Sequence, residues 1–183
     1  IALVAINLLA TTGDVAIAHA FNEFALDTQY LPFIIGGFAG IAALIAIPGK
    51  RGGKRRTVFV TGMWSCVALG LLGFWWHLES QLVWRGAMSL KTYVYTAPLA
   101  APMAYAGIAT IGLVAASKAE MILGWTKRQW VYFLVAGGSL GNASLCVLDH
   151  ARNGFINPTE WIPIPVTLFT AVLFFGAAVR PVI

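Results

Sequence analysis

The side chains best suited to chemistry in this sequence are its three histidines, each of which has a carboxylate within a few residues. His19 precedes Glu23 by four positions, so on a helix both would project from one face. Imidazole and carboxylate groups together are typical ligands of zinc, iron and copper in sites that keep an open coordination position. We therefore expect a transition-metal site, with candidate ligands His19, Glu23, His77, Asp149 and His150.

Two other interpretations of these residues stay open. A haem or chlorin would use only two of the histidines as axial ligands and would leave the carboxylates unexplained. Alternatively, the histidines and acids are ordinary residues of polar loops, and Asp149 and His150 only mark the end of a helix. The sequence lacks a nucleophile elbow, H-E-x-x-H and C-x-x-C, so no catalytic residue is assigned.

The elements that must position these side chains are membrane helices. Of the 183 residues, 59% are hydrophobic and 10% are charged, whereas a soluble domain usually carries about 25% charged residues. The lipid bilayer is therefore the expected solvent. The net charge of +5 comes from bases between apolar runs, most densely in "GKRGGKRR" (Gly49–Arg56). This pattern favours an anchor on lipid phosphates and argues against nucleic-acid binding.

The apolar runs predict an all-α, polytopic integral membrane bundle of about six transmembrane helices in one domain, because a helix needs about 20 residues to cross a bilayer. The first run is the weakest, since Thr11 to Asp14 interrupt it, and a signal segment is the alternative there. We recognise no internal repeat. The expected spans are residues 1–21, 31–48, 57–77, 92–117, 129–149 and 161–179.

The basic residues also predict an orientation. If all six spans cross, most of the lysines and arginines fall on one side, which the positive-inside rule makes cytoplasmic. Both termini would then be cytoplasmic. The histidines would lie at the outer ends of the first, third and fifth spans, level with one another in depth.

Small and polar residues predict which faces of the spans meet protein. The stripes Gly36–Gly40 and Gly62–Cys66–Gly70 would let neighbouring helices approach closely. A polar stripe in the fifth span would direct Asp149 into the bundle. Pro98 and Pro102 are expected to kink the fourth span.

The leading functional hypothesis is a small multi-span membrane protein whose outer-face His/carboxylate cluster binds a transition metal such as Zn, Fe or Cu. We expect it to work with other membrane subunits in a larger complex, or as a homo-oligomer. A first alternative is a non-catalytic scaffold subunit that binds haem, pigment or lipid. A second is a small-solute permease, which ranks lower because neither an inverted repeat nor a broken helix pair is visible.

Overall fold

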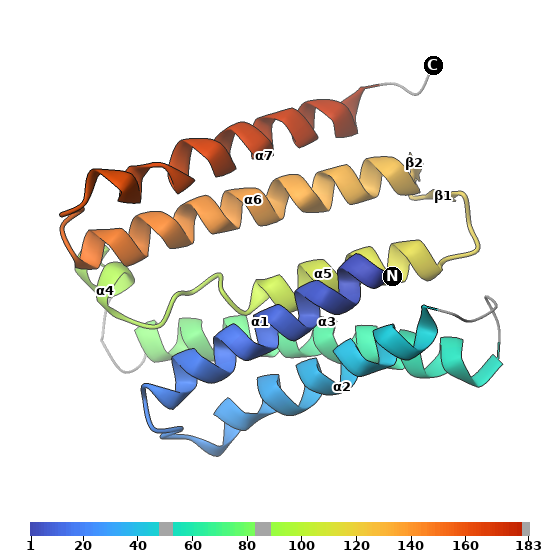
Figure 1. The fold of residues 1–183 in the computed structure, drawn as a ribbon, viewed down its shortest axis with the longest axis horizontal. Coiled ribbons are helices and arrows are strands. Elements are labelled where there is room, and N and C mark those ends of the chain that lie inside the picture. The colour runs from blue at the N-terminus through green and yellow to red at the C-terminus, as the bar shows by residue number, and fades with distance from the viewer. Residues whose placement is uncertain (48–52, 83–88, 181–183) are drawn as a thin grey trace. The chain divides into compact units, whose positions relative to one another are not determined.

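The described chain is built almost entirely of helices. A computed structural model describes residues 1–47, 53–82 and 89–180. The prediction of an all-α fold is confirmed, and among the described residues the only sheet is a two-stranded hairpin. The elements in chain order (Figure 1) are α1 (Ala2–Ala20), η1 (Asp27–Tyr30), α2 (Leu31–Ala46), α3 (Gly53–Leu82), α4 (Leu90–Tyr95), α5 (Met103–Ala116), β1 (Met121–Ile122), β2 (Trp125–Thr126), α6 (Lys127–Arg152), η2 (Pro158–Trp161) and α7 (Pro163–Val179).

Most of the predicted spans are present as helices. Five helical segments are long and apolar enough to cross a membrane, and they coincide with the first, second, third, fifth and sixth predicted spans. The chain is therefore a multi-pass integral membrane protein. The side of the membrane that each terminus faces stays a prediction. The five segments are Ala2–Ala20, Asp27–Ala46, Gly53–Leu82, Lys127–Arg152 and Pro158–Val179.

The fourth predicted span, residues 92–117, is wrong as one continuous helix. Helix α4 ends at Tyr95 and α5 begins only at Met103, so the segment 96–102 is not helical. The physical reason lies in Pro98 and Pro102, which lack an N–H and disfavour the helical conformation of the residue before them. Helix α5 has 14 residues, fewer than the about 20 that a span requires.

Contacts divide the chain into two compact units. Unit 1 consists of Ile1–Leu71 and Ala104–Glu120, and therefore holds α1, α2, α5 and the larger part of α3. Unit 2 consists of Leu72–Met103 and Met121–Ile183, and holds the end of α3 with α4, α6 and α7.

The core of unit 1 depends on small residues, as the sequence predicted. A Cβ atom added to Gly40 would lie 2.6 Å from Cδ2 of Leu9, so the glycine lets α2 approach α1 closely. Gly62 of α3 similarly faces Ala39, whose Cα would lie 3.2 Å from an added Cβ. Cys66, in the predicted stripe of α3, is fully buried.

Tyr105 occupies the centre of unit 1. Only 1% of the residue is exposed, and its hydroxyl lies 3.3 Å from Oγ1 of Thr12 and 3.4 Å from the carbonyl oxygen of Pro32. The ring lies directly against Gly36, because an added Cβ there would be 2.6 Å from Cε1 of the tyrosine. Glycine at position 36 is therefore needed to make room for this ring between α1 and α2.

In unit 2, α6 and α7 lie side by side (Figure 1). Before α6, Leu123 and Gly124 both have positive φ, 50° and 78°, as the tight turn between β1 and β2 requires. Thr126 then caps α6 in a reciprocal capping box with Gln129. The side chain of Gln129 also donates to the carbonyl oxygen of Ala178 at 3.1 Å, which ties α6 to the end of α7.

The packing of Tyr105 generates a first prediction. We expect Gly36→Ala to lower the free energy of unfolding by about 1–3 kcal/mol, because the new methyl group overpacks the hydroxyl of Thr12 and the ring of Tyr105. The matched control is Gly37→Ala, since a Cβ there has nothing within 4 Å. That control should be neutral or stabilising by up to about 1 kcal/mol through helix propensity. Thermal unfolding in detergent measures both, and equal effects would contradict this role of Tyr105.

Candidate functional site

The non-helical segment 96–102, which belongs to unit 2, is held by side chains of α3. Nδ1 of His77 lies 2.8 Å from the carbonyl oxygen of Pro98 and acts as the donor, because a carbonyl only accepts. Nε2 of Gln81 donates to the carbonyl oxygen of Ala97 at 3.0 Å. His77 and Gln81 are four residues apart and so share one face of the helix. Together they replace helical N–H donors that the segment 96–102 no longer supplies.

Arg152, at the end of α6, binds residues at the end of α4, where the non-helical segment begins. Its Nε donates to the carbonyl oxygen of Val94 and its Nη2 donates to that of Thr96, both at 2.7 Å. Hydrogen bonds from a guanidinium are short and strong because the donor is charged. The end of α4 is therefore fixed to the end of α6.

Gln81 and Arg152 are functional candidates that the sequence reasoning missed. Gln81 is completely buried, and within the described residues its Oε1 has no hydrogen-bond partner. The available signal was the pair Pro98 and Pro102, because an interrupted helix leaves carbonyl groups that need donors nearby. Gln81 stands one helical turn after His77 and is placed to supply such a donor.

His150 begins the turn that joins α6 to α7. The backbone N–H groups of Asn153 and Phe155 both donate to its carbonyl oxygen at 3.1 Å. Phe155 has φ of 51°, in the left-handed region, and stacks on Trp161 with ring centroids 4.1 Å apart. Nδ1 of His150 lies 3.5 Å from Oε2 of Glu160, an ion pair when the imidazole is protonated. That oxygen is buried and makes no hydrogen bond among the described residues.

His19 begins a turn of the same construction between α1 and α2. The N–H groups of Asn22 and Phe24 donate to its carbonyl oxygen at 3.0 and 3.2 Å. Phe24 has φ of 47° and stacks on Tyr30 with centroids 4.5 Å apart. A single turn of 3₁₀ helix follows in each case, η1 here and η2 after His150, and it leads directly into the next long helix.

These two turns reveal an internal repeat, so the expectation of no repeat is wrong. At a constant offset of 131 residues, "HAFNEFALDTQYLPF" (His19–Phe33) aligns without a gap with "HARNGFINPTEWIPI" (His150–Ile164). The His, Ala, Asn, Phe, Thr and Pro residues are identical. The same offset aligns the "LVA" of residues 3–5 with that of residues 134–136. The hairpins α1–α2 and α6–α7 therefore share one turn in sequence and in backbone geometry, although the bodies of their helices differ.

The structure does not gather the predicted metal ligands into a recognisable centre. No group of three or more His, Cys, Asp or Glu residues able to hold a metal occurs among the residues that the structure describes. Glu23 is exposed, while His77 and His150 have the partners given above. The metal site and its ligand set therefore stay a prediction. Asp149 is exposed rather than directed into the bundle, because α6 packs through Ala136, Ala143 and Leu148.

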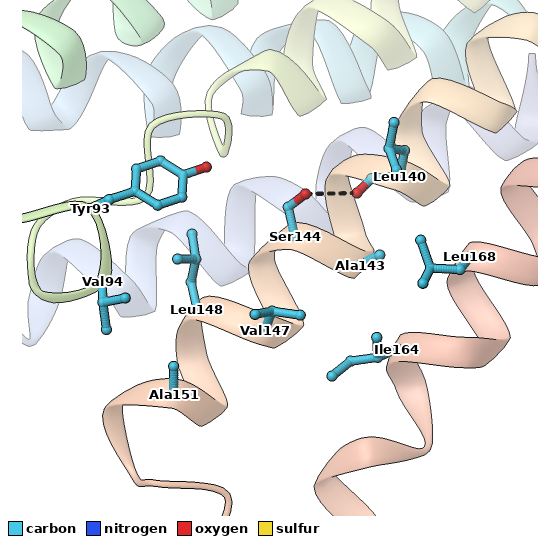
Figure 2. A pocket seen from close by; sticks show the side chains of 10 residues that line it. All are labelled: Tyr93, Val94, Leu140, Ala143, Ser144, Val147, Leu148, Ala151, Ile164 and Leu168. Carbon is cyan, nitrogen blue, oxygen red and sulfur yellow. Dashed lines mark hydrogen bonds between the residues drawn. The ribbon is translucent and has the colours of Figure 1, made fainter. Parts of the chain in front are cut away.

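An apolar groove of about 490 Å³ lies beside the interruption in unit 2. Figure 2 shows Ile164 and Leu168 of α7 projecting toward α6. Ser144 is one of the two lining residues with a polar side-chain atom, and its hydroxyl already donates to the carbonyl oxygen of Leu140 at 3.1 Å. Such a wall suits hydrocarbon. The lining residues are Tyr93, Val94, Leu140, Ala143, Ser144, Val147, Leu148, Ala151, Ile164 and Leu168.

The two copies of the hairpin differ in what covers their paired helices. In α1–α2 the ring of Tyr105 packs against Gly36 and Thr12. By the 131-residue offset, the counterparts of these two residues are Thr167 and Ala143, and Ala143 lines the groove. The hydroxyl of Thr167 donates within its own helix to the carbonyl oxygen of Pro163 at 2.7 Å. One copy is thus covered by an aromatic side chain, and the other presents an open groove.

Comparisons with known protein families, with curated proteins and with solved structures find no match for this chain.

The strained phenylalanines generate a second prediction. Phe155→Ala should be less stable than Phe155→Gly by about 1 kcal/mol, because both lose the stack with Trp161 but only glycine adopts positive φ freely. The same order is expected at Phe24. Phe133, which lies inside α6, is the control. There the order should reverse, because glycine is about 1 kcal/mol worse than alanine inside a helix.

Thermal unfolding of the six variants in one detergent measures these differences. If alanine is as stable as glycine at both turns, the left-handed phenylalanines carry no strain. If only one turn shows the effect, the two turns are not equivalent.

Proposed function

We propose that this integral membrane protein binds the hydrocarbon chain of a membrane lipid in the groove between α4, α6 and α7. The observation that carries the proposal is the apolar lining of that groove, whose volume of about 490 Å³ falls in the range of about 300–1,000 Å³ typical of small-molecule sites. This function is one of those expected from the sequence for a scaffold subunit.

The difference between the two hairpins supports the proposal. In α1–α2 the side chain of Tyr105 covers the paired helices, and the absence of a side chain at Gly36 leaves room for its ring. In α6–α7 the corresponding position 167 is a threonine whose hydroxyl is satisfied locally, and the lining beside it is apolar. An acyl chain in the groove would cover α6–α7 much as Tyr105 covers α1–α2.

Binding of this kind depends on shape. Lipid hydrocarbon is as apolar as the groove, so moving an acyl chain into it gains little hydrophobic free energy. Close packing against the groove wall must then hold the chain, because each dispersion contact is small and only a fitted surface makes many of them. A side chain that fills the groove should therefore displace the lipid.

A small-solute permease is a second candidate, favoured by two features absent from the sequence reasoning. The sequence repeat and the break between α4 and α5 are these features, and internal repeats and broken helices both occur in transporters. Against immediate passage, the carbonyl groups of Val94, Thr96, Ala97 and Pro98 all accept hydrogen bonds from side chains of the same unit. For transport, these side-chain hydrogen bonds would have to break so that the carbonyl groups could accept hydrogen bonds from the solute.

Assembly with other membrane subunits is a further part of the proposal. Asn142 and Asp149 of α6 are exposed, and polar side chains within a membrane span usually face protein or a water-filled space. A second protein chain beside α6 would provide such surroundings.

The groove yields a third prediction. Val147 lines it and is 40% exposed, whereas Val172 of α7 is 70% exposed and lies outside the lining. We expect Val147→Trp to lose lipid that copurifies with the wild-type protein, because the indole fills the groove. Val172→Trp, the same substitution on a lipid-facing surface, should retain it. Native mass spectrometry after release from detergent counts the bound lipid.

Two outcomes of the lipid measurement would contradict the proposal. Equal lipid retention by the wild type and both tryptophan variants would contradict binding in the groove, as would a wild-type protein that carries no lipid after purification from native membranes.

A further inference from the structure

Arg152 adjoins two of the residues that line the groove. Its guanidinium is bonded to the carbonyl oxygen of Val94, itself a lining residue, and the preceding residue Ala151 also lines the groove. Figure 2 shows Val94 and Ala151 together at the end of the groove away from Leu140 and Leu168. The second bond, to Thr96, fixes the guanidinium in place.

The charge of Arg152 is not neutralised by a carboxylate in the described structure. Within residues 1–47, 53–82 and 89–180 no carboxylate forms an ion pair with Arg152, and Arg152 is exposed. A guanidinium has five N–H donors, and the bonds to Val94 and Thr96 use one on Nε and one on Nη2. The remaining donors belong to the same planar fork, which suits the oxygens of a phosphate.

Comparison of the two hairpins shows that the positive charge of Arg152 occurs only in the hairpin that has the groove. By the 131-residue offset, the counterpart of Arg152 in the first hairpin is Phe21. The hairpin covered by Tyr105 therefore has an apolar residue at this position, and the hairpin with the groove has a cation. Trp161, 54% exposed, is the last residue of η2, nine positions after Arg152, and exposed tryptophan is typical of the level of lipid head groups.

We propose that the occupant of the groove is a glycerophospholipid whose phosphate is bound by Arg152 while one acyl chain lies between α6 and α7. This inference rests on the proposed function and adds the class of head group. Arginine supplies the selectivity that the apolar wall lacks, since hydrocarbon alone cannot distinguish a bound lipid from the surrounding bilayer.

The test compares two lipids with identical acyl chains, phosphatidylglycerol and diacylglycerol, that are added to the delipidated full chain in detergent. Wild-type protein should bind phosphatidylglycerol about tenfold more tightly, the effect of a charge-assisted hydrogen bond. Arg152→Gln should bind both lipids equally, at the level of wild type with diacylglycerol. Arg128→Gln is the matched control, because it removes the same charge from an exposed site at the other end of α6 and should keep the preference.

The outcomes separate this inference from the proposed function. If Arg152→Gln weakens the binding of both lipids alike, Arg152 only positions α4, and the head-group inference is overturned while the groove still binds lipid. If wild-type protein binds phosphatidylglycerol and diacylglycerol equally, the head-group inference is wrong whatever the variants show. If Val147→Trp binds lipid as well as wild type does, the groove is not the site and both proposals fail.

Two further measurements keep the inference testable should Arg152→Gln fold poorly. Arg152→Lys keeps the positive charge, and it should retain part of the preference for phosphatidylglycerol. In wild type, the preference should decrease as salt is added, because exposed charges are screened. A preference that is insensitive to salt would contradict a phosphate bound at an exposed arginine.

Discussion

The structure depends most on one constraint, that backbone polar groups in a membrane must find partners within the protein. Prolines at 98 and 102 separate α4 from α5, and the carbonyl groups before and at the break accept hydrogen bonds from His77, Gln81 and Arg152. By satisfying these carbonyls, Arg152 fixes the end of α4 against the end of α6. Residues of α4 thereby become one wall of the apolar groove.

The duplicated hairpin shows how one backbone arrangement serves two purposes. Both copies place a histidine at the end of a helix, a left-handed phenylalanine in the turn and a stacked aromatic residue in a 3₁₀ helix. The backbone of the turn is thus kept, although the side chains around it change. Glu160 stands where the first copy has Gln29, and Arg152 where it has Phe21. At these two positions, the same turn backbone therefore carries charged side chains in α6–α7 where α1–α2 has uncharged ones.

Several elements were predictable because they follow from local properties of the sequence. Long apolar runs require helices in lipid, and five predicted spans are present. Small residues at helical spacing predicted the close contacts of Gly40 and Gly62. The interruption was underestimated, because prolines inside an apolar run are compatible with either a kink or a break. The repeat was missed because it is strongest in one short turn and weak in the helices.

The sequence by itself determined the membrane environment, the helical class, the approximate spans and the small-residue faces, since hydropathy and backbone chemistry are properties of consecutive residues. Only the tertiary structure decided what each polar side chain does. His77 serves a carbonyl group, Asp149 is exposed, and Arg152 reaches Val94 and Thr96 from far along the chain. Such partners depend on which helices pack together, and hydropathy carries no information about that choice.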